Sequence, residues 1–332
     1  MPAEWEPHER TLMAWPTDLR SWGIHLEEAR RVYAGLAEAI LAFEPLTMLV
    51  NTGEMENARR TLPGGVDLVE IPYDTAWVRD SGPFIVIDGH GERAGVDFAF
   101  NAWGNGFGVE MKSEASGALI LDHLGIERIA SPMVLEGGAI TVDGEGTLIT
   151  TEQCLLDPNR NPGMSRSDIE RELGDRLGIE EVIWLPYGIV EDLVTDGHVD
   201  AVCTFARPGT VVFQSADDPS DPNHERMAAN RAVLDAAVDA RGRHLEVIDL
   251  PPMSGEQFDG VSIGVAYANL CVVNGGVIIA VGDYPTDEDA LAVLGDAFPD
   301  REAVGIPGAL ISYAGGGPHC TTQQIPRAGG SA

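Results

Sequence analysis

The chain has 332 residues, 44% of them hydrophobic, and carries 53 acidic against 21 basic side chains, for a net charge of −32. This charge repels nucleic acids and anionic membranes, which bind proteins through Lys and Arg, and it attracts small cations. No apolar run is long enough to span a bilayer and no signal-peptide pattern opens the chain, so we expect a cytoplasmic protein.

Only one of the 21 basic residues is a lysine, Lys112. A large acidic excess with so little lysine is typical of adaptation to a salt-rich cytoplasm. The cysteines are widely spaced and form no CxxC pair: Cys154, Cys203, Cys271 and Cys320. We therefore expect free thiols and neither a zinc ribbon nor a disulfide framework. The first three lie in apolar runs and are expected in the core.

Helical periodicity predicts helices over residues 25–43, 116–124, 167–177, 223–241 and 286–298. The third is expected to open with a capping box, Ser167 to Glu170. Between the helices, β-branched runs predict strands within residues 84–88, 139–151, 199–213 and 268–281. Two of these runs, around residues 142–147 and 272–277, have the turn residues of hairpins.

Each strand region opens with a polar residue beside an apolar run, and these openings recur at nearly even intervals of about a fifth of the chain: Asp80, Glu136, His198, Tyr267 and Cys320. Such spacing indicates an internal α/β repeat that closes into a ring. The length alone would suggest about two domains, but the even repeat favours a single domain over residues 1–332.

If the openings converge, the centre holds three carboxylates, an imidazole and a thiol: Asp80, Glu136, Asp200, His198 and Cys320. His198 and Asp200 would face the same side of a strand. Carboxylates gathered together require a cation. Three oxygen ligands with one thiolate match no common zinc site, so we expect no metal. A guanidinium, with five N–H donors in a plane, fits carboxylates better.

A thiol above a bound guanidinium can attack its central carbon, and a nearby histidine can carry the proton. The glycines at 315–317 leave Cys320 little obstructed. Beside it, His319 is expected to make a structural hydrogen bond. Arg160 is expected to lie in a turn and to form an ion pair there. The segment 104–108 lacks the strand-to-helix context of a dinucleotide site, and we expect a flexible loop near the pocket mouth.

Six motifs, in order over residues 1 to about 326, resemble the agmatine deiminase family and, more broadly, the guanidine-modifying superfamily with the bacterial peptidylarginine deiminases: Met1 to His8 with Trp15-Pro16, Trp77 to Pro83, Glu136-Gly137-Gly138, Asn159 to Pro162, Gly197 to Asp200 and Gly315 to Gln324. The resemblance implies a five-bladed α/β propeller of pseudo-symmetric ββαβ modules, a pentein-like fold. It also implies hydrolysis of agmatine to N-carbamoylputrescine and ammonia without a cofactor.

The resemblance further implies a role for each site residue. Cys320 would form a covalent amidino-cysteine intermediate, and His198 would act as acid and then as base. The carboxylates Asp80, Glu136 and Asp200 would bind the guanidinium. Trp77 would flank the substrate.

One departure concerns the far end of the substrate. The family places an acidic residue four positions before the histidine, where this chain has Val194. Asp192 or Asp196 are candidates to compensate. We expect the binding partner to be a small cationic guanidine. Arginine, peptidyl-arginine and a guanidino acid remain alternatives to agmatine. The sequence leaves open whether the protein forms a homo-oligomer.

Two other functions compete with hydrolysis. An amidinotransferase would pass the amidino group to an amine instead of water, so that ammonia release without an added amine separates the two. A catalytically silent guanidine-binding protein is disfavoured because a sensor needs no nucleophile.

Overall fold

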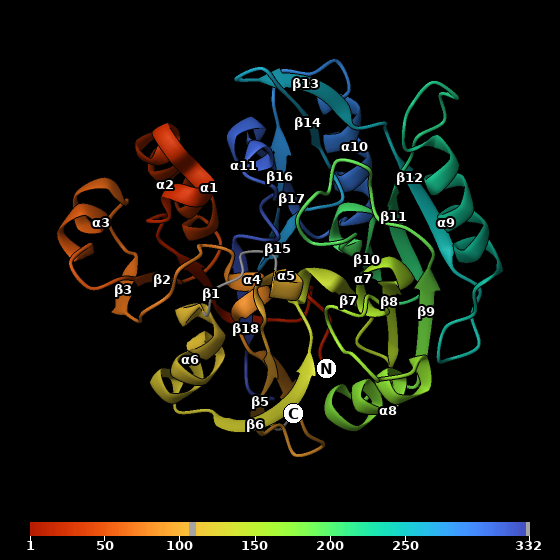
Figure 1. Ribbon diagram of the computed structural model, residues 1–332, viewed down its shortest axis with the longest axis horizontal. Helices are drawn as coiled ribbons and strands as arrows, with labels where there is room; N and C mark the ends of the chain where they lie inside the picture. The colour runs from red at the N-terminus through yellow and green to blue at the C-terminus, as the bar shows by residue number, and fades with distance from the viewer. Residues whose placement is uncertain (106–110, 330–332) are drawn as a thin grey trace.

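The computed structural model describes residues 1–105 and 111–329, so residues 106–108 of the loop expected over 104–108 lie outside the described residues. Helices α3, α6, α8 and α9 lie at the periphery of the molecule, with strands toward its middle (Figure 1). Within the described ranges, no helix combines the length and the hydropathy that crossing a membrane requires.

Five sheets of the described chain share one arrangement, with two antiparallel strands followed by a helix and a third, parallel strand. Four units are continuous in sequence. The bounds are β4 (Phe84–Ile87), β5 (Arg93–Ala99), α6 (Ser116–Leu124) and β6 (Glu127–Val134); β7 (Ile140–Val142), β8 (Thr147–Thr151), α8 (Arg166–Leu177) and β9 (Glu181–Leu185); β10 (Cys203–Arg207), β11 (Thr210–Gln214), α9 (His224–Ala236) and β12 (Glu246–Leu250); and β15 (Cys271–Val273), β16 (Gly276–Val281), α10 (Asp287–Ala297) and β17 (Glu302–Pro307). The helix is the crossover that a parallel pair requires.

The remaining unit joins both ends of the chain. Its strands and helices are β18 (Thr322–Pro326), β1 (His8–Ala14), α2 (Leu26–Leu41), β2 (Leu46–Val50), α3 (Met55–Thr61) and β3 (Asp67–Glu70). Strand β18 pairs antiparallel with β1, for example Gln323 opposite Leu12. Strand β1 pairs in parallel with β2. The C-terminal strand, which follows Cys320, is therefore fixed by the N-terminal one.

Short elements lie within the units or between them. Those within units are α1 (Leu19–Trp22), η1 (Gly23–His25), α5 (Ala102–Asn105), η2 (Lys112–Ala115) and α7 (Glu152–Leu155), and those between units are α4 (Val78–Ser81), η3 (Gly137–Ala139), η4 (Val199–Ala201) and α11 (Ala309–Tyr313). A further hairpin of β13 (Ser254–Phe258) and β14 (Val261–Val265) forms a separate two-stranded sheet, which the sequence pattern did not predict.

The amphipathic stripe of α2 confirms the first predicted helix. Its apolar positions are fully buried: Ala29, Tyr33, Leu36 and Ile40. The helix ends at Leu41, so Phe43 lies beyond it and packs over Gly276 at the turn of the β15–β16 hairpin. Both predicted hairpins are confirmed, with Val142 opposite Leu148 and Val273 opposite Gly276.

Two helix boundaries were predicted wrongly. The capping box of α8 begins at Ser165, because the Ser165 and Asp168 side chains each accept from the other's backbone N–H. Helix α9 ends at Ala236, short of the predicted residue 241. There the Asp239 carboxylate accepts from the N–H groups of Arg241 and Arg243, a local turn that competes with further helix.

Candidate active site

The polar residues at the openings of the five units come together in space. They lie just before the first strand of each unit: Asp80, Glu136, His198, Asp200, Asn269 and Cys320. His198 and Asp200 do not lie on a strand as predicted, since His198 is the N-cap of the 3-10 turn η4 that contains Asp200. Both side chains nevertheless reach the same glycine, Gly138.

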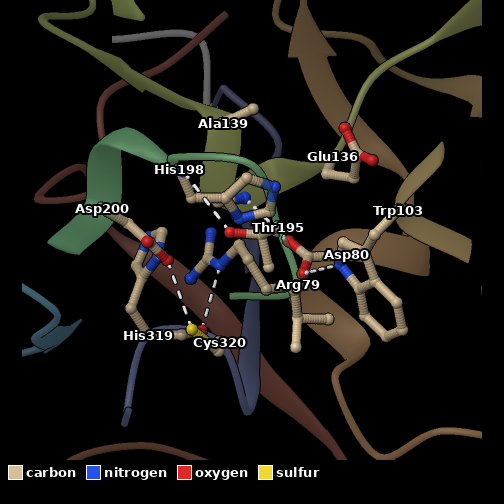
Figure 2. Close-up of polar contacts among 12 residues, drawn as sticks. Arg79, Asp80, Trp103, Glu136, Ala139, Thr195, His198, Asp200, His319 and Cys320 are labelled. Carbon is tan, nitrogen blue, oxygen red and sulfur yellow. Dashed lines mark hydrogen bonds and ion pairs between the residues drawn. The ribbon is translucent and has the colours of Figure 1, made fainter. Parts of the chain in front are cut away.

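The Cys320 thiol lies at the inner end of a cavity and is 8% exposed. Its Sγ donates to Asp200 Oδ2 at 3.3 Å (Figure 2). It also accepts from Asn269 Nδ2 at 3.2 Å. Burial, Asp200 and Asp80 raise the pKa of Cys320 well above its ordinary value. The thiol is therefore protonated at neutral pH when the cavity holds no cation.

Gly138 provides the space in which three site residues meet. A Cβ on this residue would lie 2.4 Å from His198 Nδ1, 2.8 Å from Asp200 Oδ2 and 3.0 Å from Asp80 Oδ1. The Gly138 N–H donates to Asp80 Oδ1 at 2.9 Å. His198 Nδ1 lies 3.8 Å from the same oxygen. Any larger residue at position 138 would separate the imidazole from the carboxylates.

Glu136 lies behind His198, away from the cavity, and is fully buried. Its Oε1 accepts from Arg160 Nε at 2.7 Å, and Arg160 also donates to Asp196 at 2.6 Å. The expected charge-paired role of Arg160 is confirmed. Burial raises the pKa of Glu136 although Arg160 opposes the shift. The walls of the cavity, as far as the chain is described, do not include Glu136, which was expected to contact the guanidinium.

Glu136 and His198, with Cys154, place potential metal ligands within 4.8 Å of one another. Glu136 Oε2 and His198 Nε2 have no hydrogen-bond partner among the described residues. The Arg160 guanidinium already supplies positive charge to Glu136. A second cation would be repelled by it, so this group fits a metal poorly.

Two tryptophans form one wall of the cavity beside Asp80. Trp77 is 6% exposed, and a Cβ on Gly316 would lie 2.6 Å from its ring, so the glycine allows the Cys320 loop to approach the indole. Trp103 donates from Nε1 to Asp80 Oδ2 at 2.9 Å (Figure 2). No sequence signal identified Trp103, because its segment has irregular backbone with a φ of 52°.

The outer part of the cavity contains the segment around Val194, whose side chain is exposed. The Asp192 carboxylate accepts from the N–H groups of Thr195, Gly197 and His198, so it organises the loop. Asp196 is paired with Arg160. Neither aspartate is therefore available to compensate for Val194. Glu191 lines the cavity, and among the described residues only its Oε2 accepts a hydrogen bond, from Asn223 Nδ2 at 2.8 Å.

The other cysteines and His319 occupy the positions expected. Cys154, Cys203 and Cys271 are buried. Cys154 lies in helix α7 and not in a strand-like run. His319 bonds Asp200 through Nδ1 at 3.0 Å and Glu4 through Nε2 at 2.9 Å, which confirms a structural hydrogen bond and brings in a glutamate that the sequence did not reveal.

Comparisons with known proteins agree over nearly the whole chain. The family profile of the Porphyromonas-type peptidyl-arginine deiminases matches residues 1–326. A relative, the agmatine deiminase of Pseudomonas aeruginosa strain LESB58, is 46% identical over 351 residues, covering 98% of this chain and 95% of the relative. The solved agmatine deiminase of Enterococcus faecalis is 34% identical with a TM-score of 0.95, covering 99% and 96% of the two chains. A dimethylarginine dimethylaminohydrolase, 14% identical with a TM-score of 0.54, covers 96% of this chain and 100% of its own, and shares the fold.

Proposed function

This chain belongs to the Porphyromonas-type peptidyl-arginine deiminase family and is an enzyme acting on guanidino C–N bonds, and from that premise we propose that it hydrolyses agmatine to N-carbamoylputrescine and ammonia. One observation carries the proposal. Two adjoining cavities share the Cys320 thiol. One is also lined by His198 and Asp200, and the other by Asp80.

In the proposed first step, Asp80 and Asp200 accept charge-assisted hydrogen bonds from the N–H groups in the guanidinium plane. The bound cation offsets the repulsion that keeps Cys320 protonated. Cys320 Sγ then attacks the guanidinium carbon, forming the C–S bond, and the thiol proton passes to His198. His198 gives a proton to one terminal nitrogen, the C–N bond breaks and ammonia leaves.

The second step consumes one water. His198, now neutral, takes a proton from the water while the oxygen attacks the carbon of the amidino-cysteine. The C–S bond breaks, Cys320 Sγ takes up the proton of the new hydroxyl group, and the ureido product leaves while His198 passes its proton to the solvent. The atoms balance without a cofactor: one guanidine and one water give one urea and one ammonia. Glu136, held by Arg160 behind His198, is placed to support the charged imidazole.

We assign recognition of the distal ammonium of agmatine to Glu191. Among the carboxylates that line the outer cavity in the described chain, its Oε1 alone has no internal partner, since Asp192 is used by its own loop. Trp77, expected to flank the substrate, lies against the same cavity and can make a cation–π contact with the guanidinium.

A second candidate is a deiminase acting on a guanidine without a distal ammonium. The observation that favours it is the exposed, apolar Val194 where the family has an acidic residue. In either case we propose that residues 1–332 form one domain, a five-bladed α/β propeller of pseudo-symmetric modules. The five similar sheets and the β1–β18 pairing support this architecture.

A substrate panel tests the proposal. Agmatine, arginine, an arginine-ended peptide and a guanidino acid are each incubated with the protein, and ammonia and ureido product are measured, with and without an added amine. We expect the highest kcat/KM with agmatine and equal amounts of both products without an amine. Ammonia that appears only with an added amine would identify an amidinotransferase, and no turnover of any guanidine would contradict a hydrolase.

A further inference from the structure

The floor of the site contains a histidine between two carboxylates. Figure 2 shows His319 beside Asp200, with the Cys320 thiol joined to the same carboxylate by a dashed line. His319 Nδ1 lies 3.0 Å from Asp200 Oδ2, and His319 Nε2 lies 2.9 Å from Glu4 Oε1. His319 and Asp200 are each 4% exposed.

Both ring nitrogens of His319 face carboxylate oxygens, and an ionised carboxylate can only accept hydrogen bonds. Both contacts are hydrogen bonds only if each nitrogen carries a proton, so the geometry requires an imidazolium. Burial and Arg79 would lower the pKa of His319, but Glu4 and Asp200 together raise it. Burial would raise the pKa of Glu4, yet Arg79 and His319 bring it down to about 2.

The charged groups around His319 come from four elements. Glu4 belongs to the N-terminal segment, Asp200 to η4, Arg79 to α4 and Cys320 to the loop before β18. Arg79 donates to Glu4 Oε1 at 3.2 Å and to the His319 carbonyl oxygen at 3.3 Å. The backbone of Glu4 is in turn held by the His8 side chain. The imidazolium therefore sits in a fixed, water-poor network rather than at a surface.

We propose that Glu4 and His319 form a positioning pair that keeps a positive charge behind Asp200 and thereby sets how readily the Cys320 thiol ionises. Cys320 Sγ and His319 Nδ1 share one oxygen, Asp200 Oδ2. When the thiol loses its proton, the thiolate faces the Asp200 carboxylate. The imidazolium that contacts the same Asp200 oxygen offsets the repulsion between them. Glu4 acts one contact further away, by keeping His319 protonated.

This inference rests on the proposed cysteine chemistry, but its test does not need turnover. The rate of Cys320 alkylation by iodoacetamide, measured against pH and mapped to Cys320 by peptide mass analysis, reports the thiolate fraction. Cys320→Ala supplies the background from the buried thiols. A failure of the proposed cysteine chemistry would be seen in a separate experiment, because Cys320→Ala would then still turn over agmatine.

We expect His319→Asn to move the alkylation curve to higher pH by about one unit, so that alkylation at a fixed pH slows roughly tenfold. Asn retains a donor toward Asp200 but carries no charge. Glu4→Gln should move the curve in the same direction, because His319 then loses its proton at lower pH. The positive charge lost from His319 is nearer to Cys320 than the negative charge removed from Glu4, so its effect dominates. Glu6→Gln, an exposed carboxylate two residues along, is the matched control and should superimpose on the wild type.

If His319→Asn does not fold, Glu4→Gln decides alone. A Glu4→Gln curve that superimposes on those of the wild type and Glu6→Gln would overturn the proposal and leave His319 as a purely structural residue.

Discussion

The Cys320 thiol faces carboxylates on two sides, and their charge decides when it can become a nucleophile. At an effective dielectric constant of 20, two unit charges 4 Å apart interact by about 4 kcal/mol. With Asp200 Oδ2 at 3.3 Å from Sγ, the thiolate is disfavoured and the pKa of Cys320 is raised. In the proposed mechanism, a guanidinium bound between Asp80 and Asp200 offsets this repulsion, so that the substrate itself promotes ionisation of Cys320.

The distal-ammonium assignment gives a prediction at the same scale. Glu191→Gln removes the negative charge while keeping the bond to Asn223, and we expect the KM for agmatine to rise about tenfold with little change in kcat, the effect of about 1.4 kcal/mol of lost binding. Val194→Asp, which restores the acidic position of the family, should lower the KM for agmatine.

The control for both variants is an alkylguanidine without an amine, whose KM should not respond to either change. Steady-state kinetics on the two substrates provides the measurement. If Glu191→Gln weakens both substrates equally, Glu191 shapes the cavity and does not recognise the ammonium.

At the scale of elements, the site depends on short turns that precede the first strand of each unit. Gly138 in η3 lies where His198, Asp200 and Asp80 meet. A Cβ there would be 2.4 Å from the imidazole, a distance that requires a shift of the ring. Because misplacement by about 1 Å can cost around 10²-fold in rate, small changes in these turns matter more than changes in the outer helices.

Gly138→Ala is therefore expected to lower kcat/KM by about 10²-fold or more while the protein stays folded. The matched control is Gly35→Ala in the middle of α2, where a Cβ meets nothing within 4 Å. This change should leave activity intact and raise the unfolding free energy by about 0.5–1 kcal/mol. Kinetics and urea denaturation measure both quantities, and equal activity of the two variants would show that the crowding at Gly138 is unimportant.

The sequence predicted those elements that have strong local signals. The apolar stripe of α2 and the turns of two hairpins are local patterns, and they appear at the expected places. Many strands lie outside the predicted regions, among them β18 and the β13–β14 hairpin, since pairing with a distant partner or a separate small sheet leaves no periodic trace. Helix α9 was predicted too long because the Asp239 turn competes with helix through side-chain bonds that periodicity does not contain.

The candidate site was predictable to a similar extent. The regular openings indicated which side chains converge, and the structure brings Asp80, His198, Asp200 and Cys320 together. The reason given for His198 and Asp200 was wrong, because they sit on a 3-10 turn. Trp103 comes from a segment without a motif, and Glu4 lies in the Met1 to His8 motif, to which no site role was assigned, so only the folded chain reveals their contacts.

At the scale of the whole molecule, the net charge of −32 is a large self-repulsion. Described ion pairs such as Arg231 with Asp235 and Asp249 offset it locally. The 21 basic residues are too few to pair all 53 acidic ones, so most of the excess can be reduced only by counterions.

We expect the Tm to rise as NaCl is increased from low concentration to about 1 M, over which the Debye length falls to about 3 Å. Thermal unfolding monitored by circular dichroism at a series of salt concentrations measures this. A Tm that is constant or falls over the series would show that charge repulsion does not limit the stability of this fold.

The proposed mechanism depends on a covalent bond between Cys320 Sγ and the guanidinium carbon, and trapping that species is the decisive measurement. Wild-type protein is mixed with agmatine, quenched in acid during steady-state turnover and analysed by intact-protein and peptide mass spectrometry. We expect an adduct on the Cys320 peptide equal in mass to agmatine less ammonia, absent from Cys320→Ala. In His198→Asn, the side chain keeps some hydrogen bonding but can neither give the leaving nitrogen a proton nor take one from water, so turnover should slow by about 10²–10⁴. Turnover by Cys320→Ala at more than about a thousandth of the wild-type rate would contradict the covalent mechanism.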